Sequence, residues 1–169
     1  MSKRSLAWRR LAAFGIDWCL IAVWGTALFG VVLLFARGDL PRPSGPWVGQ
    51  GIGFVAMTVP VLLYGALMES STWRGTIGKR CMSLQVVGAD GGQVSRGRAA
   101  LRNVVKFTPW ECGHTVAHQA VFAGEHMPPL WVSLLAIAAC LMPIWWIGTI
   151  VVRGAAPYDL WSATNVEMK

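Results

Sequence analysis

The sequence predicts an all-helical integral membrane protein, in which residues 1–169 form a single domain built as a small bundle of four transmembrane helices. Hydrophobic residues make up 54% of the chain and charged residues only 14%, whereas about a quarter of the residues in an average soluble domain are charged. The apolar residues gather in long runs, and most basic residues lie between these runs. The net charge of +7 therefore favours loops that face anionic lipid headgroups.

The first crossing is predicted at residues 11–36. Every residue in this run is apolar or small apart from Asp17, and at about 1.5 Å per residue the run can span a hydrocarbon core of about 30 Å. The apolar core of a signal peptide has only about 7–15 residues, so we expect a helix that is retained in the protein. Glycines and prolines in residues 37–46 end this helix.

Two more apolar runs predict two more crossings, at residues 47–68 and 130–152. Pro60 lies inside the first of these runs. We expect it to kink the helix, because proline removes one backbone hydrogen bond.

A cytoplasmic loop is predicted at residues 69–108. Within it, the segments MSLQVV and GQVS flank ADGG, which predicts a short hairpin with a tight turn. The later stretch SRGRAALRNVVKF predicts an amphipathic helix lying on the membrane surface, because Arg98, Arg102 and Lys106 recur every four residues on one face.

A fourth crossing is predicted at residues 109–127, although this segment is more polar than the others. The excess of Lys and Arg on the cytoplasmic side of membrane proteins decides between the two topologies. If the segment crosses, both termini are cytoplasmic and 13 of the 15 Lys and Arg residues lie inside. If it does not cross, three helices span the membrane and the division becomes 11 to 4. We therefore expect four crossings and two cytoplasmic termini.

Asp17 lies six residues inside the first predicted crossing, which places it about 9 Å along the helix. An ionised carboxylate at that depth is costly unless it is paired or hydrated. Arg10 is seven residues earlier and projects from the same helical face, so we expect Arg10 to be its partner. The pair is either a fixed structural link or part of a proton or cation site. The same face could also meet Asp159.

Three polar residues of the fourth predicted crossing share one helical face, because Glu111, His114 and His118 are spaced at i, i+3 and i+7. Glu-x-x-His is a spacing by which helices present metal ligands. These residues are therefore candidates for a metal site, for a proton or cation path, or for a polar seam between helices. A second Glu-x-x-His is absent from the sequence, so a two-metal site would need a dimer partner. No cofactor is predicted.

Four sequence motifs, in this order, resemble the RDD family of bacterial integral membrane proteins. They are RRLAAFGIDW, GTIGKRCMSLQVVGADGG, RAALRNVVKF and YDLWSATNV. By motif position, the arginine and two aspartates that give the family its name correspond to Arg10, Asp17 and Asp159. The conserved positions of the family also match these residues: Thr76, Gly78, Lys79, Arg102 and Asn103.

The resemblance implies a multi-pass protein of the bacterial cytoplasmic (inner) membrane. Transport of an unidentified ligand has been suspected for the family, with cation/proton exchange among the proposals. One position departs from the family pattern, because Tyr158 stands where the family commonly has histidine before the second aspartate. A proton role of that histidine therefore cannot be carried over.

Two functions remain as expectations. The first is a transporter, expected as a homodimer, that exchanges a monovalent cation for protons. In this function Asp17 binds the ion, Arg10 tunes it, and Glu111 and His114 extend the path, with Asp159 nearby. The alternative is a non-transporting accessory or scaffold subunit of a larger membrane complex. An enzyme is not expected, because the sequence offers no nucleophile–base pair. Nucleic acid is not an expected partner, since no aromatic stacking platform accompanies the basic loop.

Overall fold

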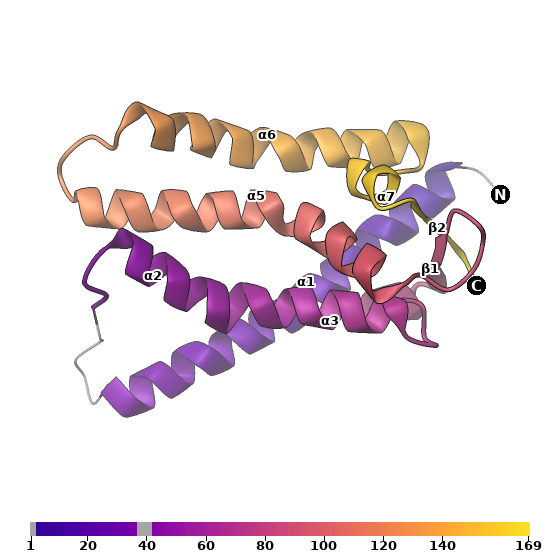
Figure 1. Cartoon of the computed structure of the whole chain (residues 1–169), viewed down its shortest axis with the longest axis horizontal. Coiled ribbons are helices and arrows are strands. Elements are labelled where there is room, and N and C mark those ends of the chain that lie inside the picture. The colour runs from indigo at the N-terminus through magenta and orange to yellow at the C-terminus, as the bar shows by residue number, and fades with distance from the viewer. Residues whose placement is uncertain (1–2, 37–41) are drawn as a thin grey trace.

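The computed structural model describes residues 3–36 and 42–169, which are mostly helical. The helices α5 and α6 lie along the long axis of the molecule, and α1 runs obliquely across it (Figure 1). The two strands and α7 gather at one end, where α1 begins, and we call this the terminal end. The elements in chain order are α1 (Lys3–Ala36), α2 (Pro46–Gly53), η1 (Phe54–Thr58), α3 (Val59–Ser70), α4 (Ile77–Cys81), β1 (Leu84–Gly88), α5 (Arg96–Ala123), α6 (Leu130–Arg153), α7 (Pro157–Trp161) and β2 (Thr164–Met168).

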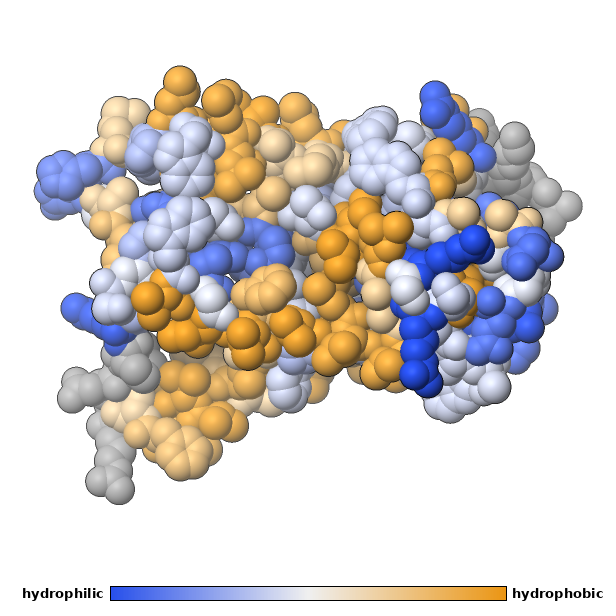
Figure 2. Space-filling view, viewed as in Figure 1, coloured by the Kyte–Doolittle hydropathy of each residue, from blue (hydrophilic) through white to orange (hydrophobic). Residues whose placement is uncertain are grey.

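Among the described residues, three helical segments are long and apolar enough to cross a membrane, and each contains one crossing predicted from the sequence. Many of their large apolar side chains are exposed, as Val23, Leu34 and Ile144 illustrate, and apolar residues cover much of the face seen in Figure 2. This is the surface that lipid requires, so the chain is a membrane protein. The segments are Ser5–Ala36, Pro46–Ser70 and Leu130–Arg153. The helix break expected at residues 37–46 falls partly outside the described residues.

A π-helical turn interrupts the second long segment. This turn, η1, joins α2 to α3 just before Pro60. Proline has no N–H that could donate a hydrogen bond to the carbonyl of Ala56, four residues earlier. The indole N–H of Trp24 donates to this carbonyl instead, at 3.1 Å. The irregularity expected at Pro60 thus takes the form of a π turn. The carbonyl of Ala56, which Pro60 leaves without a backbone donor, links this segment to Trp24 of α1.

The helix α5 has 28 residues and joins the predicted surface helix to most of the fourth predicted crossing, at residues 109–127. The side chain of Ser95 caps its start by accepting a hydrogen bond from the N–H of Arg98. The helix runs on through Pro109, and Figure 1 shows a bend in it. It packs against α2, α3 and α6. The expected surface helix is thus wrong in its placement, because Arg102 is 1% exposed and finds its partners inside the protein.

A small sheet corrects the predicted hairpin. The strand β1 pairs antiparallel with β2 at the other end of the chain, with Leu84 opposite Met168 and Val86 opposite Val166. The turn at ADGG is present, but it closes only one bridge, between Val87 and Gln93. A second strand has no room there, because α5 begins at residue 96. The sheet brings the segment that carries Asp159 back beside the start of α5.

Two apolar clusters hold the terminal end together. One packs the sheet against α1 and the start of α5, through Ala13, Val86, Ala99 and others. The second packs Trp146 and Ile150 of α6 against α7 and the start of α1. The polar residues described next lie at this end and are enclosed by these contacts.

Candidate functional site

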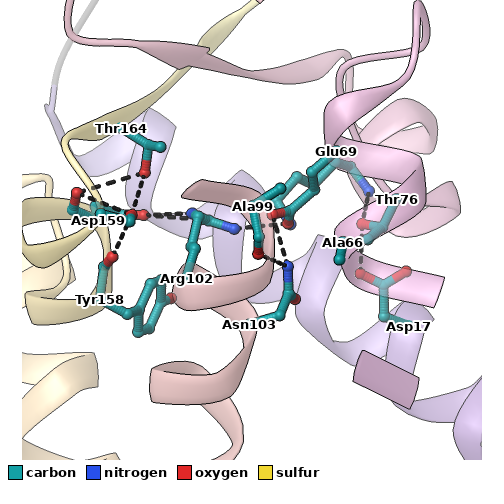
Figure 3. A network of polar contacts seen from close by, with 12 residues as sticks. Asp17, Ala66, Glu69, Thr76, Ala99, Arg102, Asn103, Tyr158, Asp159 and Thr164 are labelled. Carbon is teal, nitrogen blue, oxygen red and sulfur yellow. Dashed lines mark hydrogen bonds and ion pairs between the residues drawn. The ribbon is translucent and has the colours of Figure 1, made fainter. Parts of the chain in front are cut away.

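Arg102 is the centre of a buried network of charges. It projects from the second turn of α5 and lies between Asp159 and Glu69 (Figure 3). One guanidinium nitrogen donates to Glu69 Oε1 at 2.6 Å, and another donates to Asp159 Oδ1 at 2.7 Å. The ring of Tyr158 lies 5.1 Å from the guanidinium carbon, which adds a cation–π contact. One arginine therefore bridges two carboxylates from elements far apart in the sequence.

Glu69 is fully buried in the last turn of α3 and has three partners. Besides Arg102, the ammonium of Lys79 donates to it at 2.7 Å, and the amide of Asn103 donates to it at 3.0 Å. Glu69 was not among the predicted site residues, because it is the first residue of the segment predicted as a polar loop. Its signal was its place, since it is a carboxylate at the edge of an apolar run.

Asp159 forms the other half of the network and is also fully buried. Its second oxygen pairs with the guanidinium of Arg10 and accepts from the backbone N–H of Ala156 at 2.8 Å. Arg10 also donates to the carbonyl of Gly154 at 2.7 Å. We call Arg10, Glu69, Lys79, Arg102 and Asp159 the ion-pair cluster. It joins α1, α3, α4, α5 and α7 at the terminal end.

Charge compensation fixes the ionisation of Asp159. Burial alone would raise its pKa, but the guanidiniums of Arg102 and Arg10 outweigh burial and hold the pKa below its usual range. The carboxylate therefore stabilises the folded state at all pH values above its unfolded pKa of about 3.9. This contribution disappears only as the pH falls through the lower folded pKa.

This pKa direction predicts how the stability of an Asp159→Asn variant depends on pH. The melting temperature of the variant should lie below that of the wild type by a constant gap between about pH 8 and pH 5. The gap should close only below about pH 4, where the wild-type carboxylate also takes up a proton. Thermal melts of both proteins in detergent measure it. A gap that closes near pH 6 would show that Asp159 is not held ionised in this way.

Asp17 does not have the partner expected from the sequence. Its carboxylate accepts from Thr76 Oγ1 at 2.6 Å, from the N–H of Gly78 at 2.9 Å and from Tyr64 Oη at 3.0 Å. The expected Arg10–Asp17 pair is thus wrong, because the long Arg10 side chain reaches Asp159 while neutral donors surround Asp17. Thr76 caps α4, so Asp17 attaches α1 to the start of that helix.

A second polar group lies on α5, further from the terminal end. The carboxylate of Glu111 accepts from Gln50 Nε2 at 2.7 Å and from the hydroxyl of Thr58 in η1. His114, one turn later, lies with its Nδ1 at 3.3 Å from Glu111 Oε1. We call Gln50, Thr58, Glu111 and His114 the Glu111 site. A cavity of about 320 Å³ beside it is lined by Glu111 and Thr58, and also by Thr115.

The Glu111 site differs from the ion-pair cluster in its charge. Within the described residues, no lysine or arginine lies within ion-pair distance of Glu111. Gln50 Oε1 is buried and has no hydrogen-bond partner there. The residue that donates to the Glu111 carboxylate thus also carries an unpartnered amide oxygen, and no lysine or arginine of the described residues pairs with this carboxylate.

The structure does not support the metal site expected from Glu111, His114 and His118. Glu111 and His114 come together, but His118 lies against the backbone of α2 at Gly49 and Gly53. Among residues 3–36 and 42–169, no three His, Cys, Asp or Glu residues are placed to hold a metal ion. The two oxygens of Glu111 instead accept hydrogen bonds from Gln50 and Thr58.

Tyr158 occupies the position of the histidine that the family commonly has. Burial, and next the charge of Asp159, raise the pKa of Tyr158. Its ring packs edge-on against Trp146, with centroids 5.5 Å apart. This side chain therefore serves as a packing residue beside Arg102 and stays neutral.

Comparison with known proteins agrees with this arrangement. The family model described as the RDD family matches residues 4–162, which is nearly the whole chain. Comparison with the curated proteins found no match, and comparison with the solved structures also found none. The matched region includes the arginine and the two aspartates of the family name, Arg10, Asp17 and Asp159, all of which are buried at the terminal end. The chain belongs to the RDD family.

Proposed function

We propose that the chain is a small transporter that exchanges a monovalent cation for protons, with the ion bound at the Glu111 site. The observation that carries this proposal is the carboxylate of Glu111, which has no lysine or arginine partner among the described residues and contacts Gln50, whose Oε1 is buried without a hydrogen-bond partner there. Carboxylate, amide and hydroxyl oxygens are the ligands that hard cations prefer. A π turn lies at Thr58, and such turns are frequent at functional sites.

The ion-pair cluster takes a structural role in this proposal. Both of its carboxylates already contact two cationic side chains each, so they have little to offer a transported ion. Asp17 likewise has three donors on its two oxygens. We therefore move the ion site from Asp17, where the sequence suggested it, to Glu111. His114 can exchange a proton with this carboxylate, because imidazole both accepts and donates protons.

Transport through Glu111 requires that α5 crosses the membrane as a fourth helix. The arrangement in Figure 1 supports this. The helix α5 lies alongside α6, and the start of α1 lies at the same end of the molecule as β2. We propose that this terminal end is cytoplasmic and that the membrane is the bacterial inner membrane. Four helices form a thin pathway, so we expect the transporter to work as a homodimer.

The test of this function is cation-driven proton flux in vesicles that contain the purified protein and a pH-sensitive dye. Addition of Na⁺ or K⁺ outside should change the internal pH with the wild type. A Glu111→Gln variant keeps the size and one hydrogen-bond acceptor of the side chain but loses its charge, so we expect the flux to fall about tenfold or more.

A Glu125→Gln variant is the matched control, because Glu125 is an exposed carboxylate just after α5. It should transport like the wild type. Equal flux in the two variants would contradict the assignment of Glu111. Vesicles that stay tight with the wild type would contradict transport itself. Partners that co-purify in fixed ratio would then favour an accessory subunit of a larger complex.

A further inference from the structure

A second cavity, of about 290 Å³, lies between α1, α5 and α6, next to the ion-pair cluster. Its lining changes from cationic to apolar. Four cationic side chains and one carboxylate line it: Arg10, Lys79, Arg102, Lys106 and Asp17. Further from the terminal end the walls are apolar and include Trp18, Trp110 and Pro143. A cavity with this lining suits a molecule that has one anionic end and one apolar end.

Two polar groups in the lining, the half-buried Lys106 and the buried Trp146, have no carboxylate or hydrogen-bond partner among the described residues. Arg10, Lys79 and Arg102 pair with carboxylates. Within the described residues, by contrast, no carboxylate lies within ion-pair distance of Lys106, whose ammonium lies 5.2 Å from the ring of Phe14 and 5.1 Å from that of Phe107.

Trp146 also lines the cavity, and its buried indole N–H has no acceptor among the residues described. A buried donor without an acceptor destabilises the folded protein. Together, Lys106 and Trp146 offer one charge and one donor to whatever occupies the cavity.

We propose that this cavity binds the anionic headgroup of a membrane amphiphile, as a phosphate or carboxylate that contacts Lys106 and accepts a hydrogen bond from Trp146. The first part of the hydrocarbon chain lies along the apolar walls. The volume is near the lower end of the range for ligand pockets, about 300 Å³, so it holds a headgroup and a short length of chain. This inference does not rest on the proposed transport.

The cavity is open to an amphiphile that arrives from the bilayer. Phe14 and Ile147 belong to its lining, and they are also 39% and 45% exposed on the apolar surface of α1 and α6. Binding is measured at pH 6, where a lysine ammonium carries its proton.

The experiment measures lipid binding to the purified full-length protein by native mass spectrometry at pH 6. The probes are phosphatidylglycerol and oleate, with phosphatidylcholine as the zwitterionic reference. The wild type should retain an anionic probe in preference to phosphatidylcholine. A preference for phosphatidylglycerol identifies a phospholipid headgroup, and a preference for oleate identifies a fatty-acid carboxylate.

Three variants locate the binding. Lys106→Gln should weaken anion binding roughly fivefold or more, and Lys106→Arg should restore it. Arg98→Gln removes one charge from an exposed position of the same helix and should bind like the wild type. Equal losses in Lys106→Gln and Arg98→Gln would overturn the proposal, since they would show attraction to the surface in general. A wild type without preference for either anion would overturn it as well.

One further variant tests the cavity without changing any charge. Ala139 lines the apolar part, and Ala139→Phe should fill that part and weaken anion binding to a similar degree. Its melting temperature shows whether the variant is folded. A folded Ala139→Phe protein that binds the anion like the wild type would overturn the proposal, because the apolar chain would then lie elsewhere.

Discussion

Replacing Arg102 with methionine is expected to lower the free energy of unfolding by about 3–5 kcal/mol. Methionine keeps most of the length of the side chain and its helix propensity but removes the charge. Glu69 and Asp159 would then remain buried without the cation they share, although each keeps one other cationic partner. Breaking a buried ion pair on one side is costly for this reason. Denaturant unfolding in mixed micelles measures the loss.

The matched control for Arg102→Met is Arg98→Met, one turn earlier on α5. The Arg98 side chain is exposed, and an exposed substitution usually changes stability by less than about 0.5 kcal/mol. A difference of several kcal/mol between the two variants would show that the burial of Arg102 causes the effect. Equal stabilities would contradict the ion-pair cluster as the structural centre of the terminal end.

Replacing Gly78 with alanine is the second large effect we expect, with a loss of about 3 kcal/mol. A Cβ atom at this position would overlap the backbone carbonyl oxygen of Ala13 in α1, and it would lie 2.9 Å from the carboxylate of Asp17. Backbone atoms of a helix cannot yield as the end of a flexible side chain can. The helix α4 would therefore move away from α1, and the hydrogen bond from Gly78 N–H to Asp17 would lengthen.

Gly97→Ala is the matched control for this substitution. Gly97 lies in the first turn of α5, and a Cβ there would meet no atom within 4 Å. Alanine in a helix should raise stability by about 0.4–1 kcal/mol. Melting temperatures that move in opposite directions would support the close contact between α1 and α4. A Gly78→Ala protein as stable as Gly97→Ala would show that the two helices do not meet in this way.

The long helices could be predicted from the sequence because their signal is local. Each apolar run predicts a helix long enough to cross the membrane, and the residues that end this helix lie next to the run in the sequence. The resemblance to the family likewise predicted that Arg10 and Asp159 are both site residues. Their contact in the structure agrees with the expectation that the face of α1 carrying Arg10 could meet Asp159.

Contacts between distant segments could not be predicted in this way. The spacing of Arg10 and Asp17 on one helical face suggested a pair, but both side chains found closer partners on other elements. Likewise β1 was predicted to pair with a strand a few residues away in the sequence, but it pairs with β2, about eighty residues away. Glu69 was overlooked because its partners, Lys79, Arg102 and Asn103, meet it only after the helices pack.

The central claim is that α5 crosses the membrane and carries Glu111 into it. Labelling of single cysteines with a membrane-impermeant maleimide in intact cells tests this most directly, after replacement of the four native cysteines. His126→Cys lies in the exposed turn after α5, and Asp90→Cys lies in the exposed turn after β1. We predict that His126→Cys reacts in intact cells and that Asp90→Cys reacts only after the cells are opened. Labelling of both positions from the same side would contradict a crossing by α5, and with it the proposed ion site.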